Sequence, residues 1–301
     1  MPTESEDARL TRILKRVRRI ELLTRGIVKE TLGGAYHSRF KGQGIEFDDF
    51  REYQAGDDVR FIDWNVTARM NEPFVRKYIE ERELTVMLIV DVSGSGDYGS
   101  MDDSKRERAA EVAAVFAFSA LQNQDKVGLT LVSDQIEHYL PARKGLPHVL
   151  RMLRDTLNIV PAHRKTDLSP ALSVALERIP HRALVVVVSD FLTPDDRWLH
   201  PLRSVATKHD VVAAQVIDPR ELALPNAGRV CIQDPESGEQ FLLNTSHPAV
   251  RLKYEEAMQA RQEDLTHSLR KVGVDLLTIQ TNLDYAPAIK AYFRSRQRRK
   301  R

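Results

Sequence analysis

The sequence predicts a doubly wound α/β domain, a mostly parallel sheet with helices on both of its faces. From residue 85 onward, short β-branched apolar runs alternate with segments of helical periodicity, which is the pattern of successive β-α-β units. Two runs, residues 86–90 and 183–188, are apolar throughout, as strands buried on both faces are. Such sheets bind ligands outside the carboxyl ends of their strands, so the residues that follow the strands are candidates for a site.

The elements of this domain follow in order. A strand at 85–92 precedes a helix at 105–122, whose alanines, valines and phenylalanines form a wide apolar face. Strands at 126–132 and 136–140 should form a hairpin, and helices at 146–159 and 168–179 follow, the second with Thr166 or Asp167 as its N-cap. A strand at 183–188, a helix at 195–208 and a strand at 211–217 come next. A β-hairpin insertion at 229–233 and 240–243, a helix at 248–272, a strand at 274–280 and a helix at 285–296 complete the domain.

Two segments precede this domain. Residues 7–31 carry apolar side chains at three- and four-residue spacings and predict an amphipathic helix with a basic outer face. Its apolar residues are Leu10, Ile13, Leu14, Val17, Ile20, Leu23 and Ile27. Residues 33–83 are rich in glycine, aspartate and aromatic residues, which favours short strands and turns rather than a helix. We therefore expect an N-terminal helix (1–32), a segment packed on the core (33–84), the α/β domain (85–285, with its hairpin insertion at about 224–246) and a C-terminal helix with a basic tail (286–301).

Composition excludes several classes of protein. The formal net charge of the 301 residues is +2, so the chain as a whole attracts neither nucleic acid nor anionic lipid strongly, and the basic residues at 294–301 are interpreted as a solvated tail. The single cysteine, Cys231, excludes an internal disulfide and a four-cysteine zinc site. Residues 1–18 do not form a secretory signal, and the longest apolar runs are far shorter than the roughly 20 residues of a membrane helix. We expect a cytoplasmic protein with no membrane span and no nucleic-acid partner.

The candidate site follows the first strand of the domain. Asp91, Ser93 and Ser95 stand at alternate positions of the loop that leaves this strand, so one carboxylate and two hydroxyls can turn toward one point. Thr166 adds a third hydroxyl, and Asp190, at the end of a later strand, adds a second carboxylate. All are hard oxygen donors, which suit Mg²⁺ or Mn²⁺. The set leaves at least one coordination position for an oxygen ligand from outside.

Other interpretations of the same residues stay open. The polar triplet could simply cap the helix that follows the strand, which would make the chain a metal-free scaffold. It could also serve a Mg²⁺-dependent hydrolase or phosphotransferase, because an aspartate at a strand end can accept a phosphoryl group. The sequence has no Gly-x-Ser-x-Gly around Ser93, no zinc-binding histidine pair and no phosphate-binding Gly-x-x-x-x-Gly-Lys loop, so ATPase activity would have to come from a partner.

The five oxygen-bearing residues, together with a Thr-x-Leu-x-x-Ala-Leu run that begins at Thr166, resemble the metal-ion-dependent adhesion site of von Willebrand factor A domains. In that family the domain is a doubly wound α/β fold, and an acidic side chain of the ligand completes the metal sphere. The resemblance implies that the metal-coordinating positions are Asp91, Ser93, Ser95, Thr166 and Asp190. Arg164 and Lys165 stand where the family commonly has glycines, and two cations there could either discourage a metal or help to hold an acidic partner.

A second resemblance covers residues 44–69. This segment is similar to the hallmark of a bacterial family catalogued as domain of unknown function 58, on the residues Gly44, Glu46, Phe47, Arg51, Tyr53, Gly56, Asp57, Arg60, Asp63, Trp64, Ala68 and Arg69. Members commonly act with MoxR-type AAA+ ATPases in chaperone-like or metal-insertion systems. The resemblance implies a non-enzymatic adaptor that binds a client's acidic side chain through the metal and docks an ATPase through Arg51, Arg60, Asp63, Trp64 and Arg69. Alternatively, the charged residues only stabilise the segment, with Phe47, Tyr53 and Trp64 as packing anchors.

Overall fold

The computed structural model describes residues 15, 17–25, 45–70, 72–80, 84–100, 104–193, 195–234 and 236–298. Its contacts divide the chain into two compact units. The larger unit comprises Met1–Arg39 and Leu84–Arg301, and the smaller unit is Phe40–Glu83.

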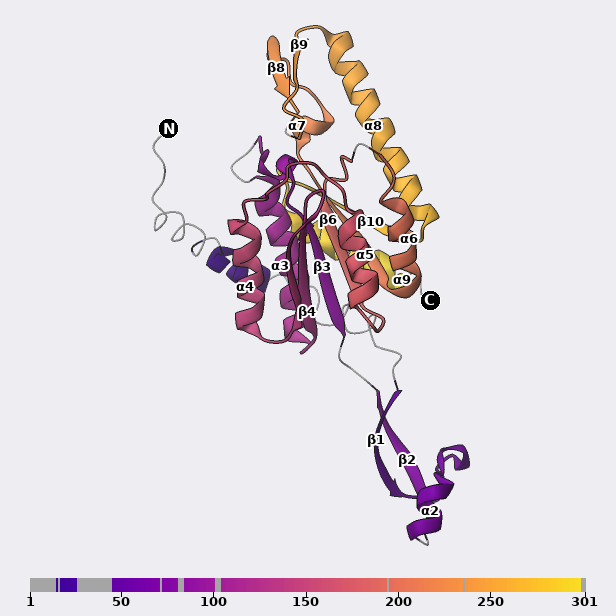
Figure 1. Cartoon of the computed structure of the whole chain (residues 1–301). Helices are drawn as coiled ribbons and strands as arrows, with labels where there is room; N and C mark the ends of the chain where they lie inside the picture. The colour runs from indigo at the N-terminus through magenta and orange to yellow at the C-terminus, as the bar shows by residue number, and fades with distance from the viewer. Residues whose placement is uncertain are drawn as a thin grey trace. The chain divides into compact units, whose positions relative to one another are not determined.

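The larger unit is built on a six-stranded sheet with the order β10-β7-β6-β3-β4-β5 (Figure 1). Five strands are parallel, and only the edge strand β5 is antiparallel, paired with β4 in the expected hairpin. The prediction of a doubly wound, mostly parallel sheet is therefore confirmed. The strands are β3 (Thr85–Asp91), β4 (Lys126–Val132), β5 (Ile136–Arg143), β6 (Leu184–Ser189), β7 (Asp210–Ile217) and β10 (Asp275–Gln280).

Helices cover both faces of this sheet. Helices α5, α6 and α8 lie over one face, and α3, α4 and α9 lie over the other (Figure 1). The helix expected from residue 195 begins only at Leu199, because the Asp195 carboxylate accepts a hydrogen bond from the Arg197 N–H and forms a turn before it. The helices are α3 (Lys105–Gln122), α4 (Leu146–Asn158), α5 (Ser169–Arg178), α6 (Leu199–Lys208), α7 (Pro219–Leu222), α8 (Pro248–Lys271) and α9 (Tyr285–Arg298).

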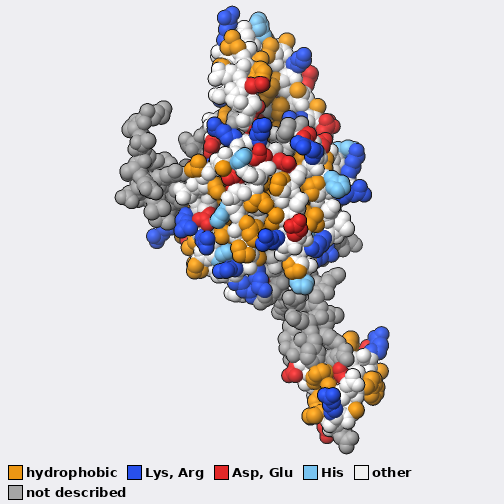
Figure 2. Space-filling model, viewed as in Figure 1, with side chains coloured by type: hydrophobic (Ala, Val, Ile, Leu, Met, Phe, Trp, Pro, Cys, Tyr) orange, Lys and Arg blue, Asp and Glu red, His pale blue; other side chains and the backbone are white. Residues whose placement is uncertain are grey.

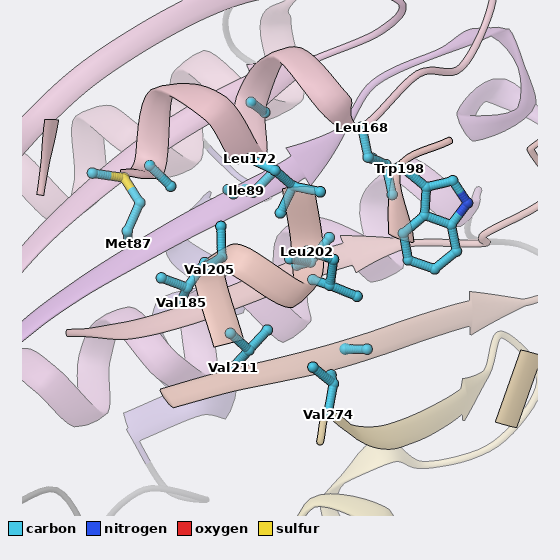
Figure 3. Packing of buried hydrophobic residues seen from close by; sticks show 14 of the residues in the cluster. Met87, Ile89, Leu168, Leu172, Val185, Trp198, Leu202, Val205, Val211 and Val274 are labelled. Carbon is cyan, nitrogen blue, oxygen red and sulfur yellow. The ribbon is translucent and has the colours of Figure 1, made fainter. Parts of the chain in front are cut away.

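The core lies between the sheet and these two layers. Met87 and Ile89 of β3 point to the face under α5 and α6, where Leu172 and Leu202 pack on them within one buried cluster (Figure 3). Because successive strand residues alternate in direction, the intervening residues of β3 are buried by the opposite layer, in which Phe116 of α3 packs on a ring of α9. A strand buried on both faces explains the uninterrupted apolar run of the sequence.

The strand register brings two strand ends to one level. Asp91, the last residue of β3, pairs with Val132 of β4, and Val90 pairs with Val188 of the neighbouring strand β6. Strands β3 and β6 therefore end side by side, and the loops after them start at the same edge of the sheet. This edge carries the candidate site.

The predicted hairpin insertion is present outside the main sheet. It consists of β8 (Arg229–Gln233) and β9 (Gln240–Asn244), an antiparallel pair in which Gln233 lies opposite Gln240. Backbone hydrogen bonds from Asp234 N–H to Glu239 O and from Gly238 N–H to Asp234 O, both 2.8 Å, close the turn. Gly238 has a φ of 77°, a conformation that glycine adopts without a steric cost.

The N-terminal helix is described only in part. Lys15 and residues 17–25 are helical, and the rest of the predicted helix lies outside the described residues. Val17 and Ile20 are buried as expected, but Leu23 is 47% exposed and Thr24 is fully buried in its place. The buried stripe is therefore rotated from the one that hydrophobic spacing alone predicts. Among the helices in the described part of the chain, none has the length and apolar character that crossing a bilayer requires.

The smaller unit is a hairpin with a short helical excursion. Strands β1 (Ile45–Glu52) and β2 (Phe74–Glu80) pair antiparallel, and a 3₁₀ turn, η1 (Val59–Phe61), and helix α2 (Trp64–Met70) connect them. The strands and turns were expected, but the helix was not. The Asp63 carboxylate accepts hydrogen bonds from the N–H groups of Asn65 and Val66, so Asp63 begins this helix as its cap. The predicted packing of this segment on the core stays a prediction.

A buried histidine at the end of α6 predicts a pH-dependent stability. The Ala183 N–H donates to His209 Nδ1 at 3.3 Å, and burial, with Lys208 and Arg182 nearby, lowers the pKa of His209 to about 4. Between the ordinary histidine pKa and this value the unfolded chain binds a proton that the folded chain does not, so stability falls as the pH falls. We expect the wild type to lose about 2 kcal/mol of unfolding free energy between pH 7.5 and pH 5 through this group.

The measurement is urea unfolding of the wild type and of His209→Gln at both pH values. The variant keeps a hydrogen-bond acceptor but cannot be protonated. Its loss of unfolding free energy between the two pH values should therefore be about 2 kcal/mol smaller than that of the wild type. Equal losses in the two proteins would show that His209 does not control the acid sensitivity.

Candidate metal site at the ends of strands β3 and β6

Asp91 lies at the centre of the candidate site. Its carboxylate is buried, with Oδ1 accepting from the Ser93 N–H at 2.9 Å and Oδ2 accepting from the Ser189 hydroxyl at 2.6 Å. Burial and the negative charge of Asp190 raise the pKa of Asp91 to about 6, against the opposing effect of these hydrogen bonds. A buried carboxylate beside a second carboxylate is a place where a cation would relieve an electrostatic cost.

Ser93 and Ser95 turn their hydroxyls toward one another. Both are buried, and their Oγ atoms are 3.2 Å apart in the 3₁₀ turn η2 (Gly94–Asp97). Neither serine caps the following helix: α3 begins with its own capping box, formed by Ser104 and Glu107. The interpretation of the triplet as a helix cap is therefore wrong, and these two buried hydroxyls stay available to a ligand.

Thr166 reaches the same edge from the loop before α5. The Gly94 N–H donates to the Arg164 backbone oxygen at 2.8 Å, which ties this loop to the turn that carries the serines. Thr166 was expected as a possible N-cap of α5, but the cap position is Leu168, and the Thr166 hydroxyl instead donates to the carboxylate of Glu236. Glu236 belongs to the β8–β9 turn and was not among the predicted site residues.

Asp190 is held by a buried lysine. Lys105, the first residue of α3, donates from Nζ to Asp190 Oδ2 at 2.6 Å and to Glu221 Oε1 at 2.5 Å. Burial disfavours the charged lysine, but the two carboxylates more than offset it, so the pKa of Lys105 is raised. Burial raises the pKa of Glu221 despite the lysine. Sequence reasoning missed both residues, because each ion pair joins positions at least 85 residues apart and no local pattern reports such a contact.

The donor set fits a small, hard cation. A cavity of about 20 Å³ lies among the predicted residues Asp91, Ser95 and Asp190, with Lys105 and Ser189 also in its wall. That volume holds about one water molecule, and a small cation is of similar size. Within the described residues no three histidine, cysteine or acidic side chains converge as a metal cluster, so a metal here would depend on hydroxyl oxygens as well as carboxylates.

The two cations that precede Thr166 are exposed. Arg164 and Lys165 expose their side chains to solvent, and only the Arg164 backbone oxygen contributes to the loop contact described above. Exposed cations at the rim leave the buried donors free of direct competition from these two side chains. Their second possible role, the attraction of an acidic partner, stays a prediction.

The five predicted docking residues of the smaller unit separate into two groups. Arg51 forms a bidentate pair with Asp57, with both N–O distances 2.7 Å, and Asp63 caps α2, so these two side chains stabilise the unit. Arg60, Trp64 and Arg69 are exposed; Arg60 forms an ion pair with Asp58, two residues before it, and Trp64 is 69% exposed. Trp64 is therefore not buried within its own unit, and the alternative that it anchors this segment on the core stays a prediction. Figure 2 shows hydrophobic side chains on the surface of this unit, and the large apolar residues exposed in its described part are Val59, Phe61, Trp64 and Met70.

The sheet order, the single antiparallel edge strand and the polar loop after β3 define a doubly wound domain of the von Willebrand factor A type. The family model described as "Protein of unknown function DUF58" matches residues 49–264, and the chain belongs to this family. An uncharacterized protein of Mycobacterium tuberculosis is 36% identical over 286 residues, which cover 94% of this chain and 89% of that protein. An uncharacterized protein of Mycobacterium avium is 32% identical over 163 residues, covering 53% of this chain and 94% of that protein.

Solved structures that align with this chain share little sequence with it. BatB from Bacteroides thetaiotaomicron aligns with a TM-score of 0.45 and 14% identity, over 71% of this chain and 98% of that one. A von Willebrand factor type A protein from Catenulispora acidiphila aligns with a TM-score of 0.39 and 14% identity, over 71% of this chain and 42% of that one.

Proposed function

We propose that this chain is a non-catalytic adaptor that captures an acidic side chain of a client protein through Mg²⁺ or Mn²⁺. The observation that carries the proposal is the pair of buried hydroxyls of Ser93 and Ser95 beside the buried Asp91, none of which serves to cap α3. Asp91 would anchor the metal, the two serines would complete its near face, and Thr166 and Asp190 would tune the ligand-bound state. A bound metal would supply the positive charge that attracts the client's carboxylate.

The charge of the site supports a role for a cation. Four carboxylates, those of Asp91, Asp190, Glu221 and Glu236, interact electrostatically with their neighbours in this cluster, Lys105 bonds two of them, and Arg106 also lines the cavity. A buried excess of negative charge is costly unless a counter-charge compensates it. A divalent cation would provide this compensation.

A Mg²⁺-dependent hydrolase or phosphotransferase that uses the same residues is the alternative. It would need a carboxylate oxygen of Asp91 free to attack a substrate. The residue is instead only 7% exposed, and it lines a cavity of about 20 Å³ that has no room for a phosphoester or ester substrate. This geometry supports binding rather than nucleophilic catalysis.

The smaller unit is proposed as the docking surface for a MoxR-type AAA+ ATPase. Its exposed side chains include Trp64 and the cations Arg60 and Arg69, and aromatic and arginine side chains are the residues that most often dominate binding energy in protein interfaces. An adaptor with one surface for the ATPase and a separate site for the client could present that client for remodelling.

The test uses immobilised wild-type chain, a MoxR-type ATPase from the same organism and a cell lysate, with Mg²⁺ or with a chelator. Client proteins should be retained in Mg²⁺ and released by the chelator, because the metal bridges the two carboxyl groups. The ATPase should be retained in both conditions by the wild type and lost from a Trp64→Ser variant, with Tyr53→Ser of the same unit as the matched control.

Two outcomes would contradict the proposal. Retention of the same clients in Mg²⁺ and in chelator would exclude the metal bridge. Turnover of phosphoester or ester substrates by the purified chain with Mg²⁺, stopped by Asp91→Asn, would establish the enzyme instead.

A further inference from the structure

An acidic side chain of this chain already lies at the rim of the candidate site. The Glu236 carboxylate accepts two hydrogen bonds from Thr166, one from the hydroxyl and one from the backbone N–H at 3.2 Å. Glu236 is half-buried, and it is close enough to Asp190 for that negative charge to act on it. Hydrogen bonds of this kind stabilise a carboxylate, whereas a second carboxylate nearby repels it. The position of Glu236 near Asp190 therefore needs a structural cause.

That cause is the turn of the β8–β9 hairpin. The Asp234 carboxylate accepts from the Glu236 N–H at 3.0 Å and from the Ser237 hydroxyl at 2.6 Å, and thereby shapes the turn that projects Glu236. The two backbone hydrogen bonds that close the hairpin also stabilise this turn. The β8–β9 turn thus holds Glu236 against Thr166, although the two residues are 70 positions apart in the sequence.

We infer that Glu236 is an internal substitute for the client's acidic group, and that the β8–β9 hairpin must release Thr166 before a client binds. The inference rests on the proposed function, because it gives Glu236 the place of the carboxylate that a client would offer. Glu236 has the chemistry of that group, it engages a residue of the predicted metal-binding set, and its hairpin lies outside the main sheet. The contact keeps the resting site closed until an acidic ligand, at sufficient concentration or affinity, displaces this one glutamate.

The hairpin carries its own reporter position. Cys231, the only cysteine of the chain, is exposed on β8, so a nitroxide can be attached there in the full-length protein without another substitution. In metal-free wild type the label should report an immobilised hairpin by electron paramagnetic resonance. Glu236→Ala and Thr166→Val each remove the contact, so both should convert the immobilised component to a mobile one. Glu239→Ala is the control, since Glu239 is an exposed acid of the same hairpin whose loss should leave the label immobilised.

Acetate then tests whether Glu236 holds the place of a partner's carboxylate. In Mg²⁺, acetate should mobilise the label of the wild type in a concentration-dependent way, chloride at equal ionic strength should not, and Glu236→Ala should not respond. If Glu236→Ala stays as immobile as the wild type, or if acetate and chloride act alike, the inference is wrong. Acetate could also mobilise the label of the wild type equally in Mg²⁺ and in chelator. That result would support Glu236 as an internal ligand but would contradict the metal bridge of the proposed function.

Discussion

Replacing Lys105 with methionine should lower the free energy of unfolding of the metal-free protein by about 3–5 kcal/mol. The lysine is 3% exposed and bonds Asp190 and Glu221 at once, so its removal leaves two carboxylates in the interior without their counter-charge. Methionine keeps most of the apolar stem, which means that the loss reports the charge rather than the packing.

Urea unfolding of the two proteins, each with Mg²⁺ and with chelator, measures this effect. Mg²⁺ should stabilise Lys105→Met more than the wild type, because a cation bound near Asp190 replaces part of the missing charge. Arg151→Met is the control, because Arg151 and Asp155 form a solvent-exposed ion pair on α4. Such pairs contribute less than about 1 kcal/mol to the free energy of unfolding. A Lys105→Met protein as stable as this control would show that the buried ion pairs do not support the site.

Asp91→Asn should abolish the Mg²⁺-induced rise in melting temperature. In chelator at pH 7.5, the variant should be more stable than the wild type. The raised pKa of Asp91, about 6, means that the folded state holds the proton more tightly than the unfolded state. Stability therefore falls as the pH rises from about 4 to about 6, and the full cost, up to about 3 kcal/mol, is present at neutral pH. Asparagine has the same shape and no charge, so it avoids that cost but loses the proposed metal anchor.

Thermal unfolding of wild type and variant, with and without Mg²⁺, at pH 7.5 and pH 4.5, separates the two effects. The advantage of the variant in chelator should shrink at the lower pH, where the wild-type carboxyl is protonated. Asp97→Asn is the matched control, because Asp97 is an exposed acid of the 3₁₀ turn η2 that follows β3, and its replacement should leave the Mg²⁺-induced rise in melting temperature intact. A Mg²⁺-induced rise in melting temperature that survives in Asp91→Asn would show that the cation binds elsewhere.

Local patterns were sufficient for most of the fold. A continuous apolar run predicts a doubly buried strand because both of its faces must leave water, and the sheet confirms this for β3 and β6. Periodicity failed where capping or packing decided instead. Helix α2 depends on the Asp63 side chain, which a glycine- and aspartate-rich segment conceals among its turn residues. The exposed Leu23 shows that spacing alone does not choose which of several adjacent apolar residues faces the core.

By itself, the sequence determined the fold class and placed Asp91, Ser93, Ser95 and Asp190 at the carboxyl ends of two strands, because these ends share one edge of a parallel sheet. The structure added that these two strands, β3 and β6, are neighbours. Only the tertiary structure decided which side chains complete that edge. Lys105, Glu221 and Glu236 reach it from a helix start, a short helix and a hairpin tip distant in the chain. Their bonds arise from the packing of these elements against each other, and long-range contacts of this kind leave no periodicity in the sequence.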